Sequence, residues 1–105
     1  MSNKFDGVSV DKVANVYFDG KCVSHGITLA DGTRKSVGVI MPASLTFNTG
    51  APEIMEGVGG SCRIRLKGES EWRICVAGQS FEVPANSSFD IVVEAEPFHY
   101  VCHYG

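Results

Sequence analysis

The sequence contains few of the features that mark a membrane-bound, secreted or nucleic-acid-binding protein. No apolar run in its 105 residues approaches the roughly 20 residues that a membrane span needs. The first residues, MSNKFDG, lack the apolar centre of a signal peptide. The net charge is −3 and no basic block is present, which disfavours nucleic acid and anionic membranes as partners. We therefore expect a cytoplasmic protein that binds neither.

Closely spaced cysteine pairs are also missing. The four cysteines are spread through the chain and none belongs to a Cys-x-x-Cys pair, which argues against a structural zinc or a thioredoxin-type site. Each lies in a strand-like segment, where a reduced cysteine behaves as a small buried hydrophobe. We expect all four to be buried and reduced. They are Cys22, Cys62, Cys75 and Cys102.

Convincing helical periods and internal repeats are absent as well. What the chain has is about nine short strand-like segments separated by Gly, Pro and Asp turns. The clearest is 62–67 (CRIRLK), in which apolar and basic residues alternate strictly. This pattern predicts an all-β sandwich or barrel. We expect a single domain over residues 17–105, preceded by an N-terminal extension, residues 1–16, of uncertain structure.

One stretch, residues 78–89 (GQSFEVPANSSF), predicts a strand, a tight turn and the start of another strand. Pro84 ends the first strand because it has no N–H to donate to a ladder. Asn86 suits the positive φ of a tight turn. The turn therefore brings Phe89 back over the sheet, towards the interior.

This stretch resembles the second conserved motif of cupins, in which a metal-binding histidine stands at the position of Phe89. The first cupin motif contains His-x-His, then a Glu, then a closing Gly. Here Phe47 and Thr49 stand at the two histidines, Glu53 at the Glu and Gly60 at the Gly. The resemblance thus implies a cupin-type jelly-roll barrel with no metal site, because three of the four ligand positions cannot bind one.

Five segments resemble a narrower family, the pyrimidine/purine nucleoside phosphorylases, in order and spacing over residues 17–104. The segments are 36–39 (SVGV), 46–49 (TFNT), 52–55 (PEIM), 78–84 (GQSFEVP) and 100–102 (YVC). The resemblance implies a small homodimeric cupin that cleaves purine and pyrimidine nucleosides. Phosphate would be the co-substrate, free base and pentose 1-phosphate the products, and no other cofactor would be needed.

Glu53 would be the one ionisable group inside such a barrel. A buried carboxyl needs a partner or a raised pKa. Its function would be to hydrogen-bond ribose hydroxyls or to stabilise the positive charge that develops on the sugar. The alternative is that Glu53 caps backbone N–H groups near the corner at 50–52. We take Glu53 and Thr49 as the candidate catalytic residues.

The candidate substrate-binding residues are aromatic and hydroxyl side chains. Aromatic faces stack on any base, so such a wall would suit a broad nucleoside specificity; the alternative is that these rings are ordinary core residues. The aromatic candidates are Phe47, Phe89 and Tyr100, and the hydroxyl candidates for phosphate are Ser36, Thr46 and Thr49. Arg34 and Lys35 could also hold phosphate, but they follow a predicted hairpin turn, where basic residues are usually solvated.

Two other functions stay open at this point. One is a non-catalytic barrel that binds a nucleoside-like ligand without turnover. The other is a metal-dependent cupin enzyme that uses Glu53 together with a histidine such as His99. The residues alone do not choose among the three functions, and the family resemblance favours the phosphorylase.

Overall fold

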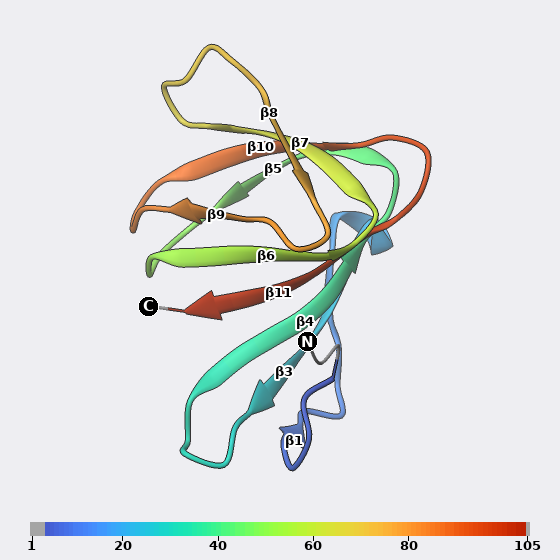
Figure 1. Cartoon of the computed structure of the whole chain (residues 1–105), viewed down its shortest axis with the longest axis vertical. Coiled ribbons are helices and arrows are strands. Elements are labelled where there is room, and N and C mark those ends of the chain that lie inside the picture. Colours follow the sequence, from blue (N-terminus) through green and yellow to red (C-terminus); the bar gives the residue numbers. More distant parts are fainter. Residues whose placement is uncertain (1–3, 105) are drawn as a thin grey trace.

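The computed structural model describes residues 4–104, which form strands and a single 3-10 turn, η1 (Phe18–Gly20) (Figure 1). The expectation of an all-β fold is confirmed. Eleven strands lie in this part of the chain, against about nine expected, because two very short ones lie near its start. The strands are β1 (Ser9–Val10), β2 (Asn15–Tyr17), β3 (Cys22–Thr28), β4 (Arg34–Ile40), β5 (Ala43–Asn48), β6 (Glu53–Gly59), β7 (Ser61–Leu66), β8 (Arg73–Val76), β9 (Ser80–Val83), β10 (Ser88–Val93) and β11 (Phe98–Tyr104).

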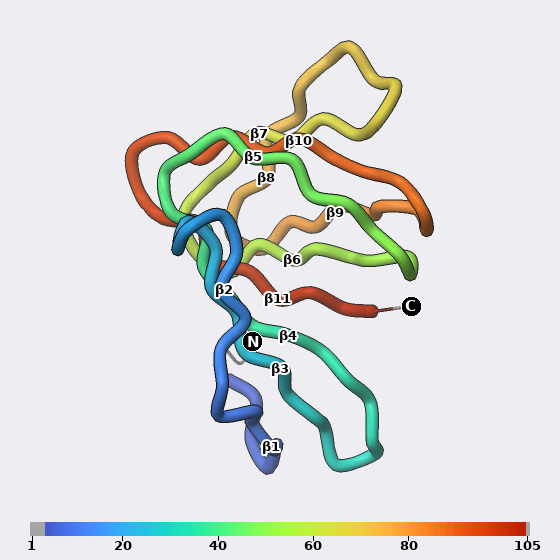
Figure 2. Tube along the Cα trace, turned by 180° about the vertical axis from the view of Figure 1, so that it is seen from behind, coloured from blue at the N-terminus to red at the C-terminus, as the bar shows by residue number. Residues whose placement is uncertain are grey.

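The strands form two antiparallel sheets. The larger has the order β1-β3-β4-β11-β6-β9, with β2 also paired to β3, and the smaller has the order β5-β10-β7-β8. Among the described residues no ladder joins the sheets, so the closed barrel that the resemblance implied is not formed. Figures 1 and 2 show the smaller sheet lying over β6, β9 and β11, while β1 and the β3–β4 hairpin extend away from it.

The core lies between the two sheets because alternate residues of the facing strands point inward. On β11, Phe98, Tyr100 and Cys102 are buried, and on β10, Phe89 and Ile91 are buried. The predicted inward face of β7 is also confirmed by its burial pattern. All four cysteines are buried, as expected. No helix within residues 4–104 is long and apolar enough to cross a membrane.

The turn between β9 and β10 has the predicted conformation. Asn86 has φ of +52°, and its N–H donates to the carbonyl of Gly50 over 3.1 Å. The Thr49 hydroxyl donates to the Pro84 carbonyl over 2.6 Å and accepts from the Ser87 N–H over 3.0 Å. The turn is therefore tied to the corner before β6, and the two segments that carry the resemblance to cupins lie side by side.

Candidate active site

A cavity of about 310 Å³ lies between the two sheets, within the range of small-molecule sites. Glu53 is the one acidic side chain among the described residues that line it. Of the seven residues that the sequence predicted as catalytic or substrate-binding, all but Thr49 line this cavity. The lining residues are Tyr17, Phe18, Ser24, Ser36, Thr46, Phe47, Asn48, Glu53, Met55, Phe89, Tyr100, Cys102 and Tyr104.

Glu53 is the first residue of β6 and is half-buried. Its backbone pairs with Tyr104 of β11 on one side and with Val83 of β9 on the other. Burial raises the pKa of Glu53 above its ordinary value, and a hydrogen bond with the Cys102 thiol partly offsets this rise. Burial, followed by the nearby Glu53 carboxyl, raises the pKa of Cys102 to about 12, so this thiol stays protonated. The cavity thus holds a carboxyl group that is costly to ionise.

Two phenylalanines of the smaller sheet, Phe47 and Phe89, form an aromatic wall of the cavity. The Phe47 and Phe89 rings are stacked, with centroids 5.4 Å apart and planes at 15°. Phe81 packs edge-on against Phe89 and is also buried, but it does not line the cavity. Phe89 is only 2% exposed, whereas Phe47 is partly buried. Phe47 therefore presents more of its ring to a ligand than Phe89 does.

Phe18 extends this wall towards solvent and was missed in the sequence. Its ring packs edge-on against Phe47 with centroids 5.2 Å apart, and its side chain is 43% exposed. Phe18 and Asp19 both have φ of +53°, a conformation that bulky residues rarely adopt. The sequence signal was the aromatic pair Tyr17-Phe18 directly before a turn, but only the fold places both residues at the cavity.

Hydroxyl groups of the larger sheet line the opposite wall. The Tyr100 hydroxyl hydrogen-bonds the Cys22 thiol over 3.5 Å. Burial of Tyr100 is the main cause that raises the pKa of its hydroxyl. The Ser36 and Tyr104 hydroxyls hydrogen-bond each other over 3.0 Å. These groups can donate to the oxygens of a sugar or an anion while remaining uncharged themselves.

Tyr100 fits into this wall because its cross-strand partner is Gly38. A Cβ at Gly38 would lie 2.6 Å from the Tyr100 hydroxyl oxygen and 2.9 Å from the Ser24 Cβ. Any side chain at this position would push the tyrosine ring away from β4. The glycine in the SVGV segment therefore leaves the space that the Tyr100 ring occupies at the site.

Two predicted residues are placed differently from the rest. Thr46 borders the cavity, but its hydroxyl donates to Asp90 over 2.7 Å on the outer face, where Asp90 also pairs with Arg65. Thr49 does not line the cavity, and its hydroxyl makes the two turn contacts described above. A catalytic action of Thr49 would require its hydroxyl to leave both partners.

Replacing Thr49 with valine should therefore affect stability far more than catalysis. The substitution leaves the Pro84 carbonyl and the Ser87 N–H without a partner, at a cost of about 1–3 kcal/mol in the free energy of unfolding. The measurement is urea unfolding together with kcat on the folded protein. Thr46→Val, at an exposed hydroxyl, is the control for stability. A large loss of kcat in a fully folded Thr49→Val protein would instead support a catalytic hydroxyl.

The donor set does not fit the metal that cupin motifs usually hold. Phe47, Thr49 and Phe89 occupy three of the four ligand positions, and Glu53 alone cannot make a competent site. His99 is exposed, on the face of β11 opposite to Tyr100. Within residues 4–104 no three His, Cys, Asp or Glu side chains are grouped as metal ligands.

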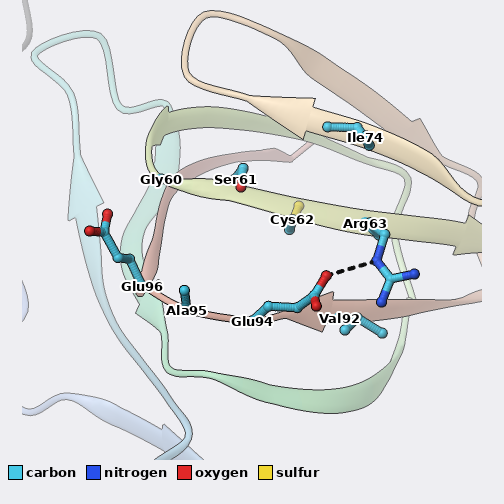
Figure 3. Close-up of a pocket in the computed structure, with 9 residues that line it drawn as sticks. All are labelled: Gly60, Ser61, Cys62, Arg63, Ile74, Val92, Glu94, Ala95 and Glu96. Carbon is cyan, nitrogen blue, oxygen red and sulfur yellow. Dashed lines mark ion pairs between the residues drawn. The ribbon is translucent and has the colours of Figure 1, made fainter.

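A larger cavity, of about 560 Å³, lies against β7, β8 and the end of β10 (Figure 3). Two of its three charged side chains, Arg63 and Glu94, pair with each other over 3.2 Å. Its lining residues Gly60, Ser61, Cys62, Ile74, Val92, Ala95 and Glu96 include no aromatic ring on which a base could stack. The smaller aromatic cavity is therefore the better candidate site.

Comparison with known proteins shows the family of the chain. Residues 12–104 match the family model described as pyrimidine/purine nucleoside phosphorylase. The chain belongs to the pyrimidine/purine nucleoside phosphorylase family. It is 76% identical over 105 residues to the pyrimidine/purine nucleoside phosphorylase of Aromatoleum aromaticum, covering 100% of this chain and 98% of that protein. The family resemblance predicted from five short segments is thus confirmed.

Two further relatives support the family and the fold. The chain is 70% identical over 103 residues to the pyrimidine/purine nucleoside phosphorylase of Thiobacillus denitrificans, covering 98% of this chain and 99% of that protein. A crystal structure of a protein of unknown function from Acinetobacter sp. ADP1 superposes with a TM-score of 0.96 at 47% identity, covering 99% of this chain and 100% of that one. The fold of this chain is thus shared with a protein whose crystal structure is known.

Proposed function

We propose that this protein is a broad-specificity nucleoside phosphorylase, a pentosyltransferase that needs no metal. The observation that carries the proposal is the half-buried Glu53 in a cavity with an aromatic wall on one side and hydroxyl groups on the other. The family name of its relatives points to the same activity. An aromatic wall accepts purines and pyrimidines alike, because every base has a face that can stack.

The proposed reaction replaces one bond to the anomeric carbon by another. A hydrogen phosphate oxygen forms a bond to C1′ of the pentose as the bond from C1′ to the base nitrogen breaks. The base leaves with the electron pair of that bond and takes the proton that the phosphate gives up. The products are a free base and a pentose 1-phosphate, so atoms and charge balance without an oxidant.

Glu53 acts on the sugar in this scheme. As the bond to the base breaks, positive charge develops on the pentose ring, and a nearby carboxylate stabilises it. Partial burial of Glu53 lowers the effective dielectric around it, which strengthens this attraction. Tyr100 and Ser36 donate hydrogen bonds to sugar or phosphate oxygens, and Phe47 stacks on the base. The enzyme is proposed to work as a homodimer with nucleosides and phosphate as its partners.

The test is release of base from inosine and uridine, each with and without phosphate. We expect release that depends on phosphate for both nucleosides, and unchanged activity after dialysis against a chelator. Absence of phosphate-dependent release from every common nucleoside would refute the proposal. Thermal stabilisation by nucleosides without turnover would instead identify a binding protein, and loss of activity with the chelator would identify a metal enzyme.

A further inference from the structure

Arg34 lies on the cavity side of the larger sheet, although its position after a hairpin turn suggested a solvated surface. Successive side chains of a strand point to opposite faces, so Arg34 shares a face with Ser36, two residues further along β4. Lys35 points to the other face, where its amine lies 2.6 Å from the Nδ1 of His103 on β11. The two adjacent basic residues therefore have different environments. Only Arg34 lies on the same face of the sheet as Ser36, beyond the residues that line the cavity.

The guanidinium of Arg34 lies over Gly26, which is the residue opposite Ser36 on the neighbouring strand. Gly26 and Ser36 are paired in the β3–β4 ladder. A Cβ at Gly26 would lie 2.6 Å from Nη2 of Arg34. Because paired residues have Cβ positions about 4.5–5.5 Å apart, the guanidinium is a close neighbour of the Ser36 side chain, which lines the cavity.

Electrostatic coupling gives independent support for this placement. The hydrogen bond with Asp11 and the charge of Asp11 are the main causes that raise the pKa of Arg34, and the Tyr104 hydroxyl group contributes as well. Tyr104 is the hydrogen-bond partner of Ser36. The positive charge thus lies within electrostatic reach of the hydroxyl pair at this end of the cavity.

Asp11 occupies one side of the Arg34 guanidinium. Its carboxylate accepts from Nη2 over 2.8 Å, while Nη1 donates to the Thr28 hydroxyl over 2.6 Å. Arginine has five N–H donors, so these two bonds leave others for a further anion. Both members of the ion pair are about half exposed, at 51% and 54%, and such pairs contribute little stability.

The site otherwise offers no positive charge to the phosphate. None of the described residues that line the cavity is Lys, Arg or His. A phosphate placed beside Ser36 would meet two hydroxyl donors there, and the planar guanidinium would add a bidentate contact.

We propose that Arg34 binds the phosphate co-substrate next to Ser36 and Tyr104, and that phosphate displaces the Asp11 carboxylate from it. This inference rests on the proposed phosphorolysis, and it assigns the anion subsite of the same cavity. In the absence of phosphate, the Asp11 carboxylate binds the Arg34 guanidinium and holds it over Gly26. Phosphate then replaces this carboxylate. The exchange costs little because the carboxylate is solvated when it leaves.

Arg34→Gln tests the cation, with Arg73→Gln as the matched control. Arg73 is also 51% exposed and pairs with Glu69 over 3.8 Å, but it belongs to β8 of the other sheet. We expect Arg34→Gln to raise the KM for inorganic phosphate at least tenfold while the Kd for nucleoside, measured without phosphate, changes less than twofold. The control should leave both constants unchanged.

Two further variants test the position and the exchange. In Gly26→Ala the new methyl displaces the ends of the flexible Arg34 and Asp11 side chains, so the charge is kept but moved, and the KM for phosphate should rise severalfold. In Asp11→Asn the internal competitor is lost, and the KM for phosphate should fall severalfold. A KM for phosphate that is unchanged in Arg34→Gln, or raised in Asp11→Asn, would overturn the inference.

Calorimetric titration with inorganic phosphate separates this inference from the proposed reaction. Phosphate binding by the unmodified protein that is lost in Arg34→Gln supports the subsite even if no nucleoside is cleaved, in which case the proposed reaction alone fails. Phosphate-dependent cleavage with an unaltered KM for phosphate in Arg34→Gln leaves the reaction standing and refutes the subsite.

Discussion

Replacing Glu53 with glutamine should lower kcat/KM for phosphorolysis by about 10²–10³-fold, the usual effect of losing one well-placed electrostatic group. Glutamine keeps the shape and a hydrogen-bonding oxygen but removes the negative charge that would stabilise the developing positive charge on the sugar. The measurement is the initial rate with inosine at saturating phosphate. Unchanged kcat/KM would show that the carboxyl group only caps neighbouring backbone groups.

The same substitution should stabilise the protein at neutral pH. Burial raises the pKa of Glu53 in the folded state, so between the ordinary pKa of 4.5 and the raised value the folded chain binds more protons than the unfolded chain. Stability is therefore lost as the pH rises through this interval, and it stays lower above it. Glutamine has no such penalty because it does not ionise.

We accordingly expect the Tm of Glu53→Gln to exceed that of the unmodified protein at pH 7, with the difference disappearing below the ordinary carboxyl pKa. Thermal unfolding across this range measures the effect. Glu82→Gln, at an exposed position on β9, is the control and should change neither Tm nor activity. A Glu53→Gln protein that is less stable at pH 7 would mean that the ionised carboxylate is favourably bonded in the folded state.

Replacing Phe89 with alanine should lower the free energy of unfolding by about 3–5 kcal/mol. The side chain is 2% exposed and lies between the Phe47 and Phe81 rings, so its removal leaves a cavity at the centre of the molecule. Such a loss is a large part of the roughly 5–15 kcal/mol that stabilises an ordinary domain. Urea unfolding measures it, and Phe89→Leu, which refills much of the space, should recover a substantial part.

Phe47→Ala distinguishes a role of this ring in core stability from a role in binding the base. This ring is only partly buried, so its loss should cost less stability than that of Phe89. Since base stacking on an aromatic ring is worth about 1–3 kcal/mol, the KM for nucleosides should rise by roughly 5- to 150-fold. The KM for phosphate should not change. An unaltered KM for nucleosides would mean that Phe47 contributes to the core and not to binding.

Local pattern was enough to predict the strands and much of the core. Strict alternation specified the inward face of β7 because side-chain direction in a strand has a period of two. Pro84 and Asn86 specified the turn into β10, because both act on the backbone of their own segment. The family also followed from the sequence, since short segments such as SVGV and PEIM kept their order and spacing.

Tertiary structure alone decided what each candidate side chain contacts. The sequence favoured Thr49 over Arg34 as a site residue, yet the Thr49 hydroxyl is engaged by the turn at Pro84, and the Arg34 guanidinium lies over Gly26, the ladder partner of Ser36. β1 escaped prediction because a strand of two residues has too few positions to show a period. Ladder partners come from distant parts of the chain, so no local signal reports them.

Local sequence and tertiary structure both contribute to the position and properties of the Glu53 carboxyl group. The sequence by itself determined that an acidic residue follows the corner at 50–52 and opens a strand, because the proline and the alternation act locally. Only the fold decided that this strand lies between β9 and β11, with Cys102 and the aromatic wall around it. Burial is a property of the assembled sheets, and burial is what raises the pKa of this carboxyl group and makes it a candidate for catalysis.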